Sequence, residues 1–437
     1  MVTLLIGLFL LLVALLGAPL FVIIGAVTLI AFAFAQTDAS IAIVELYRIT
    51  NQSVLIAIPL FTFAGYLLAE SKTPVRLVNL SRALFGWMRG GLAIVVLVSC
   101  AIFTAFTGAS GVTIVALGGL LYPVLLREKY PENFSLGLVT TSGSLGLLFP
   151  PSLPLILYGM VASLVSVQSG SRSIVSVNQL FVAGILPGLL LVIVLALYSV
   201  RKGSTAGMAR TPFSWSNVST SVGAAAWEIP LPFIIIGGIY GGFFTATEAA
   251  AITAFYVFVV EVLIYRDLSL TRDVPRVMRE SMLLVGAIIV IIGSALGLTN
   301  YLIIEEVPQK LFEFIQAYVS SKAVFLILLN IFLLIVGMMM DIFSAIIVVV
   351  PLIIPVARNF GVDPIHLGIV FLTNLEIGYL TPPVGLNLFI SSFRFEKSIA
   401  RVALSSLPFI AILLVALLII TYVPELSLWL TRVFNVS

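Results

Sequence analysis

Two segments of the chain place small polar side chains beside residues that interrupt helices. They are TTSGSLGLLFPP (140–151) and TNLEIGYLTPP (373–383), and each runs from hydroxyl or amide side chains through glycine to a Pro-Pro pair. Proline lacks the N–H that continues a helix, and it disfavours helical geometry in the residue before it. Each segment therefore predicts a helix break that frees backbone carbonyl groups. Carbonyl and hydroxyl oxygens together suit a hard monovalent cation such as sodium, and the ends of the half-helices suit an anion.

The candidate ligands come from these two segments and from two turns, FTGASG and GMMMD. For a sodium or substrate site we select Thr107, Gly108, Ser110, Thr141, Ser142, Gly143, Ser144, Asp341, Thr373, Asn374, Gly378 and Thr381, and for the structural breaks Pro150, Pro151, Pro382 and Pro383. The alternative for the first turn is that its small residues only permit close helix approach. Sodium is the expected ion, and no organic cofactor is expected.

Two carboxylates lie in otherwise apolar surroundings. A carboxylate inside a membrane costs roughly 2.5 to 3.5 kcal/mol on insertion scales, so each is a candidate for function. Asp341 is either a gate or ion residue or a helix cap, and Glu376 is expected to be structural, hydrogen-bonding the unwound segment. An intramembrane hydrolase could use both acids to activate water, but no HExxH motif and no second histidine accompany them. We therefore do not expect an enzyme.

Three other polar features are expected to be structural. Glu248 in TATEA has the position of a capping acid in a first helical turn. His366, the single histidine, is expected to be a cap or an interface residue. The four tryptophans are expected to anchor the chain at membrane interfaces; they are Trp87, Trp215, Trp227 and Trp429.

The elements that carry these residues are membrane helices. The chain has 437 residues, of which 61% are hydrophobic and 9% are charged, and its mean hydropathy is +1.22. Soluble domains carry about 25% charged residues. Long apolar blocks without strict alternation predict an all-α polytopic membrane protein and not a β-barrel. The first apolar block lacks a basic n-region and is read as mature protein. The net charge of +3 gives no reason to expect a nucleic-acid partner.

Lysine and arginine gather in five joints between the apolar blocks, and short cytoplasmic loops are where such residues collect. The joints hold 16 of the 22 basic residues, namely Lys72, Arg76, Arg82 and Arg89; Arg127 and Lys129; Arg201, Lys202 and Arg210; Arg266, Arg272, Arg276 and Arg279; and Arg394, Lys397 and Arg401. With all five joints in the cytoplasm, residues 91–126 leave and return on that side, with arms too short to span. They predict a re-entrant hairpin, and both chain termini are expected to be periplasmic.

The second hairpin and the first amphipathic stretch complete this topology. Residues 321–357 have the same hairpin form, but their flanks are poor in net positive charge, so we expect them to enter from the opposite face. PVRLVNLSRALFGWMRG (74–90) is amphipathic and basic, and is expected to lie at the cytoplasmic surface. It could act as a lever between moving and fixed parts, or it could contact lipid headgroups.

The chain repeats itself at a constant shift. Moving the sequence by 232 positions superposes Gly65 on Gly297, Pro123 on Pro355, Thr141 on Thr373, Gly146 on Gly378, and the first Pro-Pro pair on the second. Because the charges place the two hairpins on opposite faces, the copies are expected to be inverted, as in many secondary transporters. An ion channel is the less natural alternative, since broken helices serve alternating access.

Three stretches carry a family resemblance: FTGASG with LGLLFPPSLPLILYG, GGIYGGFFTATEAAA, and GMMMDIFSAIIVVVPLIIPVARNFGVDPIHLGIVFLTNLEIGYLTPPVGLNLFISS. They resemble the large membrane (M) subunit of tripartite ATP-independent periplasmic (TRAP) transporters. The resemblance implies an elevator-type, sodium-coupled importer of an organic anion in the bacterial inner membrane. It also implies a four-helix Q subunit, expected as a separate chain, and a periplasmic substrate-binding protein. The alternative is a related sodium/anion symporter that works alone.

The expected domain organisation follows the two repeats. We assign scaffold helices to 1–90, a hairpin and broken helix to 91–167, connecting segments to 168–228, scaffold helices to 229–320, the second hairpin and broken helix to 321–393, and a C-terminal helix to 394–437.

Overall fold

The protein is built from helices throughout the part that is described. The computed structural model describes residues 18–35, 54–88, 90–168, 175–205, 213–241, 243–319 and 321–434, and also positions 38, 40, 43, 44 and 47. Arg89, Arg210 and the N-terminus lie outside the described residues. Seven described helices are long and apolar enough to cross a membrane, or nine if each of two bent pairs counts as one span. The predicted all-α polytopic membrane fold is confirmed.

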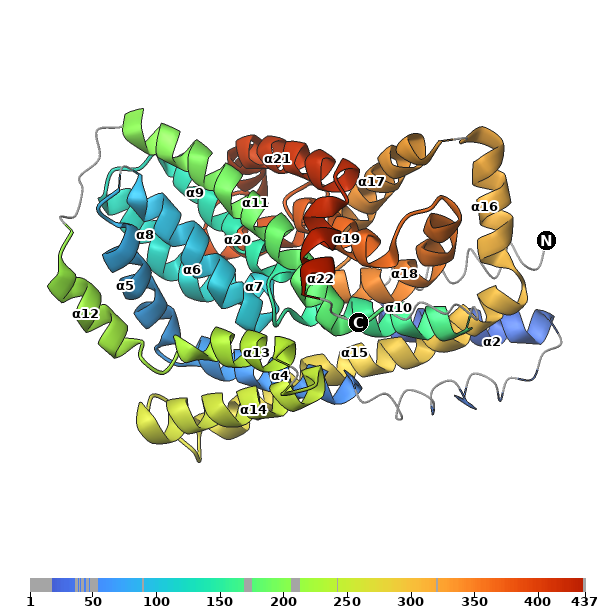
Figure 1. Cartoon of the computed structure of the whole chain (residues 1–437), viewed down its shortest axis with the longest axis horizontal. Coiled ribbons are helices and arrows are strands. Elements are labelled where there is room, and N and C mark those ends of the chain that lie inside the picture. Colours follow the sequence, from blue (N-terminus) through green and yellow to red (C-terminus); the bar gives the residue numbers. More distant parts are fainter. Residues whose placement is uncertain are drawn as a thin grey trace.

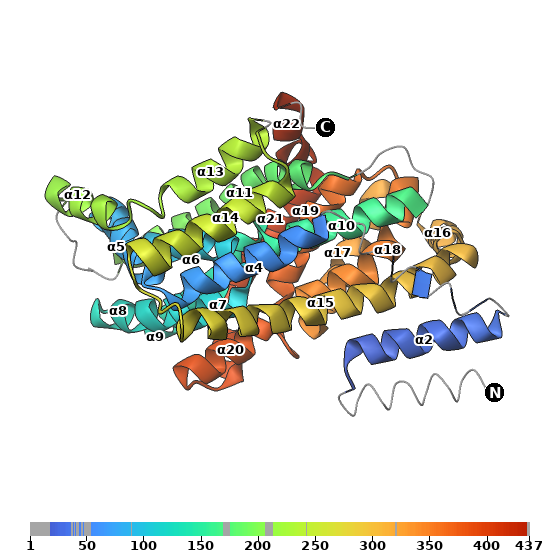
Figure 2. The ribbon, with the colours of Figure 1, turned by 90° about the horizontal axis from the view of Figure 1, so that it is seen from below.

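One layer of the molecule consists of helices that run along its long axis (Figures 1 and 2). These are α2 (Leu20–Phe34), α4 (Val54–Glu70), α13 (Pro230–Tyr240), α14 (Ala246–Phe258) and α15 (Asp273–Ile304). Helix α4 packs between α14 and α15, and α2 packs on α15. The 32 residues of α15 extend over about 48 Å, at 1.5 Å per residue. Helix α15 is therefore longer than the roughly 30 Å hydrocarbon core of a bilayer.

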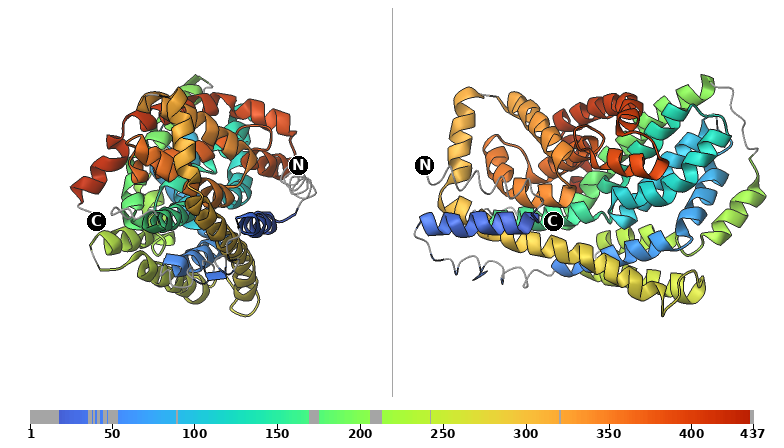
Figure 3. Two further views of the ribbon diagram at one scale, coloured as in Figure 1. Left: turned by 90° about the vertical axis from the view of Figure 1, so that its right-hand side faces the viewer. Right: turned by 180° about the vertical axis from the view of Figure 1, so that it is seen from behind.

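Two helical hairpins form at the predicted positions. The first consists of α6 (Gly91–Thr107), α7 (Ser110–Thr113), the π-helical turn η1 (Ile114–Gly118) and α8 (Gly119–Arg127), and the second of α17 (Lys322–Met339) and α18 (Ile342–Asn359). Gly108 turns the first tip with a φ of +65°, a conformation that favours glycine. The two hairpins lie at opposite ends of the molecule, as the view from behind in Figure 3 also shows.

Both predicted helix breaks are present. The first lies between α9 (Glu132–Ser142), which leads into the short 3₁₀ helix η2 (Leu145–Leu148), and α10 (Leu153–Gln168). The two halves meet at 43°. The second separates α19 (Pro364–Gly378) from α20 (Leu386–Phe395). Both Pro-Pro peptide bonds are cis. The second half of each broken helix packs on the first half of the other, because α10 contacts α19 and α20 contacts α9.

The two copies of the repeat make the same close contact. A shift of 232 carries the end of α8 onto the end of α18 and the start of α9 onto the start of α19. A Cβ atom at Gly146 would lie 2.3 Å from the Ala101 carbonyl oxygen and 2.5 Å from Ala105 N. A Cβ atom at Gly378 would lie 2.6 Å from Gly337 Cα, and Gly337 is the residue that the shift pairs with Ala105. In each copy, glycine lets the broken helix touch the hairpin backbone.

The amphipathic stretch after α4 forms α5 (Thr73–Phe85), as predicted, and is bent by 72° from α4. Its Arg76 pairs with three carboxylates of the same chain. The guanidinium lies 2.6 Å from Asp267 and 3.0 Å from Glu261, and it also pairs with Glu228. Its central carbon lies 3.9 Å from the centre of the Tyr265 ring. Burial, and then the hydrogen bond to Glu228, raise the pKa of Tyr265 to about 12. This Arg76 cluster joins α5 to the π-helical turn η3 (Val259–Ile264), which continues the end of α14, and to the turn before α13.

The remaining helices connect or surround the two copies. They are α11 (Val177–Thr205), α12 (Trp215–Ala224), α16 (Val307–Tyr318), α21 (Ile399–Tyr422) and α22 (Glu425–Val433). Helix α12 packs beside α5, and α11 and α21 pack on the broken helices. Thr245 and Glu248 form the reciprocal capping box predicted for the start of α14.

Candidate functional site

The tip of the first hairpin meets the first broken helix through hydroxyl groups. Thr104 Oγ1 lies 2.7 Å from Thr113 Oγ1 and donates a hydrogen bond to the carbonyl oxygen of Gly143 at 2.9 Å. A Cβ atom at Gly143 would lie 3.3 Å from the carbonyl oxygen of Ser110. The structure thus brings together Ser110 and Gly143, two residues that the sequence selected. Thr104 and Thr113 were missed, although both hydroxyls flank the FTGASG turn.

One hydroxyl group on each of these two elements is buried without a hydrogen-bond partner among the described residues. Thr107 Oγ1 belongs to the hairpin tip, and Thr141 Oγ1 belongs to the last turn of α9. The two side chains are almost completely buried, at 1% and 0% exposure. An unsatisfied buried polar group costs roughly 1 to 3 kcal/mol. Such groups are expected where a ligand supplies the missing partner. These neutral oxygens fit a monovalent cation.

Four of the other predicted hydroxyls donate hydrogen bonds to backbone carbonyl groups three or four residues earlier in the chain. Ser142, Ser144, Thr373 and Thr381 donate to the carbonyl oxygens of Val139, Thr141, Ile369 and Ile377, at 3.2, 3.4, 2.7 and 2.9 Å. A hydroxyl oxygen that donates still has lone pairs with which to accept. These four residues therefore remain available as ligands, but their hydrogen bonds do not require one.

In the second copy, Asn374 belongs to a buried network of amides and hydroxyls. Its Nδ2 donates to Asn330 Oδ1 at 2.7 Å and to Val370 O at 2.8 Å. Asn330 Nδ2 in turn donates to Thr421 Oγ1 at 3.0 Å. The Oδ1 atom of Asn374 is buried and has no partner among the described residues. The network therefore fixes the side chain of Asn374 and leaves its Oδ1 free to accept a hydrogen bond or a cation. Asn330 is a partner that the sequence did not indicate.

His366 lies beside this network at an interface between helices, as predicted. Its Nδ1 lies 3.2 Å from Ser427 Oγ, and its Nε2 lies 3.2 Å from the carbonyl oxygen of Thr421. The side chain is 1% exposed. The cap of α19 is Asp363, which accepts from two backbone N–H groups. His366 therefore joins α19 to α21 and α22.

Glu376 differs from the expectation in its contacts. We expected its carboxylate to hydrogen-bond the unwound segment, but Oε1 is buried and has no partner among the described residues. The reason is that α19 continues to Gly378, so Glu376 lies inside the helix and not in the break. The shift of 232 pairs it with Ser144, a residue of the first copy that we selected. Like Thr107, Thr141 and Asn374, Glu376 therefore has a buried oxygen atom without a hydrogen-bond partner among the described residues.

The broken helices also contact each other through polar groups. Thr140 Oγ1 donates to Ser391 Oγ at 2.9 Å, and Asn387 Nδ2 lies 3.5 Å from the carbonyl oxygen of Thr140. On the other side, Tyr158 OH donates to the carbonyl oxygen of Pro364 at 2.7 Å. These pairs are more than 200 residues apart in sequence. They join the two broken helices into one body.

Asp341 takes the cap position of α18. Its Oδ1 accepts from the N–H groups of Phe343 and Ser344, both at 3.0 Å, and its Oδ2 contacts Ser344 Oγ. The side chain lies on the exposed surface of the second hairpin tip. Of the two alternatives for Asp341, a gate or ion residue and a helix cap, these hydrogen bonds support the cap.

Asparagine caps helices as well as aspartate does, whereas alanine does not. We therefore expect Asp341→Asn to keep wild-type stability and transport, and Asp341→Ala to lose about 1 kcal/mol of stability. Thermal unfolding in detergent and uptake in proteoliposomes measure the two effects. A loss of transport in Asp341→Asn with unchanged unfolding would show that the negative charge itself is needed.

The fold and the site define a class of protein. Two copies of a hairpin and a broken helix, packed against long membrane helices, are the parts of a secondary transporter. The crystal structure of the YdaH transporter of Alcanivorax borkumensis has a similar fold, with a TM-score of 0.62 over 86% of this chain and 85% of that chain. The identity is 15%, so this likeness concerns the fold alone.

Sequence comparison identifies the family within that class. The family described as "Tripartite ATP-independent periplasmic transporter, DctM component" matches residues 5–426. The C4-dicarboxylate TRAP transporter large permease protein DctM of Rhodobacter capsulatus is 36% identical, covering 96% of each chain. The ectoine TRAP transporter large permease protein TeaC of Halomonas elongata is 30% identical, covering 95% of this chain and 96% of that protein. The chain belongs to the DctM family of TRAP transporter large permeases, which are transporters and not enzymes.

Another relative is longer than this chain. The isethionate TRAP transporter permease protein DctMQ of Oleidesulfovibrio alaskensis is 35% identical over a match that covers 86% of this chain and 58% of that protein.

Proposed function

We propose that this chain is the translocating subunit of a sodium-coupled importer of a small organic anion in a bacterial inner membrane. One observation carries the sodium part of the proposal, namely the two buried hydroxyls of Thr107 and Thr141 that lack partners. They belong to the hairpin tip and to the broken helix that meet through Thr104 and Gly143. A sodium ion bound there would supply the missing partner of both hydroxyl oxygens and would hold the hairpin tip against the broken helix.

The anion is proposed to bind after sodium, at the starts of the half-helices. The N-termini of α10 and α20 follow directly on the two breaks, and helix N-termini favour negative charge. The relatives are named for C4-dicarboxylates, ectoine and isethionate. These compounds share a carboxylate or sulfonate group. A substrate of this class is what we propose for this chain.

Transport is proposed to follow an elevator mechanism. The hairpins and broken helices are joined to one another by tight glycine contacts and buried hydrogen bonds. The layer formed by α4, α14 and α15 lies beside them (Figure 1). The joined body would slide along this layer and carry sodium and substrate together. The Q subunit and the periplasmic binding protein are the proposed partners, and a stand-alone symporter remains the alternative.

Replacing Thr141 by valine removes the hydroxyl and keeps the shape of the side chain. We expect the sodium concentration for half-maximal uptake to rise about tenfold or more, because one ligand with no other partner is lost. The measurement is uptake of a carboxylate substrate in proteoliposomes that contain all three components, at varied sodium.

The control is Thr253→Val on α14, where the hydroxyl donates at 2.7 Å within its own helix. It should leave the sodium dependence unchanged. If Thr141→Val and the wild type had the same sodium dependence, Thr141 would not be a sodium ligand. Uptake by this chain without its partners would favour the stand-alone symporter.

A further inference from the structure

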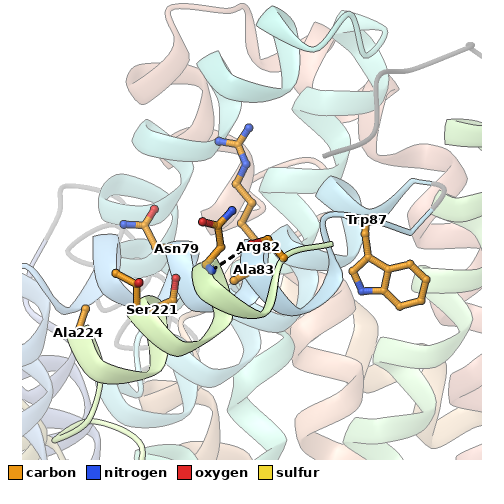
Figure 4. A pocket seen from close by; sticks show the side chains of 9 residues that line it. Asn79, Arg82, Ala83, Trp87, Ser221 and Ala224 are labelled. Atoms are coloured by element: carbon orange, nitrogen blue, oxygen red, sulfur yellow. Dashed lines mark hydrogen bonds between the residues drawn. The ribbon is translucent and has the colours of Figure 1, made fainter. Parts of the chain in front are cut away.

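The cleft between α5 and α12 has the size of a small-molecule site, and it lies outside the hairpins and broken helices. Its volume is about 340 Å³, within the range of roughly 300 to 1,000 Å³ that is usual for such sites. Asn79, Arg82 and Ala83 of α5 line it together with Trp87, which follows that helix, and α12 adds amide and hydroxyl groups, among them Asn217 and Ser221 (Figure 4). The cleft is independent of the proposed sodium site.

The lining of the cleft favours an anion. Arg82 supplies the positive charge, and the other polar groups are amides and hydroxyls, which can donate hydrogen bonds. No carboxylate is among the described residues that line it. Arg82 Nη2 lies 3.5 Å from Glu128 Oε1, but the two side chains are 42% and 33% exposed, and so exposed a pair is weak. The guanidinium is therefore available, and its planar fork matches phosphate oxygens.

The cleft lies where lipid headgroups are expected. Helix α5 is bent by 72° from the membrane helix α4, so it runs across the direction of the spans. Three exposed aromatic side chains stand beside the cleft and contact one another edge to face. Trp87 lies 6.0 Å from Phe213, and Phe213 lies 5.2 Å from Trp215, between ring centres. Tryptophan rings prefer the level of the headgroups.

We propose that the cleft between α5 and α12 binds the phosphate group of an anionic phospholipid. Arg82 and the hydroxyl and amide groups of α12 contact the phosphate, and the aromatic cluster of Trp87, Phe213 and Trp215 lies against the neighbouring part of the lipid. A lipid bound here would contact both α12 and α5. It would thereby link α12, which belongs to the connection between the two copies, to the helix that carries Arg76.

The test is native mass spectrometry of the delipidated chain in detergent, with phosphatidylglycerol, phosphatidylcholine and inorganic phosphate as separate probes. Phosphatidylglycerol is expected to bind more tightly than phosphatidylcholine, and inorganic phosphate is expected not to compete. Arg82→Gln should weaken phosphatidylglycerol binding about fivefold, the effect of one basic residue beside an anionic lipid. Ser221→Leu, which fills the cleft without changing the charge, should weaken it as well.

The control is Arg272→Gln, at an exposed arginine that starts α15. It should bind phosphatidylglycerol as the wild type does. An equal loss in Arg82→Gln and Arg272→Gln would mean general attraction by charge and would overturn the proposal. Competition by inorganic phosphate would show that the ligand is the free ion and not a lipid. Unchanged binding in Ser221→Leu would place the lipid elsewhere.

Discussion

Gly146→Ala and Gly378→Ala are expected to abolish transport and to lower the unfolding temperature of the purified chain. In each variant the new methyl group would lie 2.3 to 2.6 Å from backbone atoms of the adjacent hairpin. Backbone cannot rotate away as a flexible side chain can, so hairpin and broken helix must separate. Overpacking of this kind typically costs 1 to 3 kcal/mol, and we expect about 3 kcal/mol. Uptake in proteoliposomes should fall to background.

The matched control is Gly286→Ala in α15. A Cβ atom at Gly286 would meet nothing within 4 Å. Alanine is the better helix former by about 1 kcal/mol, so this variant should be as stable as the wild type or slightly more so, with normal uptake. If Gly146→Ala had the same stability and uptake as Gly286→Ala, α6 and the first broken helix would not be in close contact at Gly146.

The second large effect is expected at the Arg76 cluster. Arg76 is 12% exposed, and its three carboxylate partners are between 0% and 6% exposed. Arg76→Met leaves these carboxylates buried without their common cation. Removing one partner of a buried ion pair costs roughly 3 to 5 kcal/mol, and we expect a loss of this size. Thermal unfolding measures it, and proteolysis should show α5 released from the end of α14.

Two further variants separate the lost pairing from a general effect of losing an arginine. Arg276 lies 2.8 Å from Glu70, and their side chains are 49% and 38% exposed. Arg276→Met should cost less than about 1 kcal/mol, because exposed ion pairs contribute little. Adding Glu261→Gln to Arg76→Met should restore part of the stability, since one unpaired charge is removed. Equal losses in Arg76→Met and Arg276→Met would contradict the buried arrangement.

Much of the fold could be predicted because its decisive features are local in sequence. Gly108 turns the first hairpin and each Pro-Pro pair lies in a helix break, and these effects depend on the residue and its neighbours. The repeat was visible because the same glycines recur at one shift, and Gly146 and Gly378 do make equivalent contacts. Helix α5 followed from its amphipathic pattern.

The polar contacts could not be predicted, because they join residues that are distant in sequence. Arg76 belongs to the amphipathic stretch recognised in the sequence, but no local pattern pairs it with Glu261, 185 residues away. Asn330 holds Asn374 from another helix. Glu376 lies within α19 because the helix continues to Gly378. Which hydroxyl stays unpaired, as in Thr107 and Thr141, depends on packing that no local pattern contains.

We propose that the first hairpin tip and the first broken helix form a sodium site. The most direct measurement is the unfolding temperature of the purified chain in sodium chloride and in potassium chloride of equal concentration. A ligand at 100 times its dissociation constant stabilises by about 2.7 kcal/mol. We predict that sodium raises the unfolding temperature of the wild type above its value in potassium, and that Thr107→Val and Thr141→Val lose this difference. The same unfolding temperature in both salts, or a full sodium effect in Thr141→Val, would show that sodium does not bind at this site.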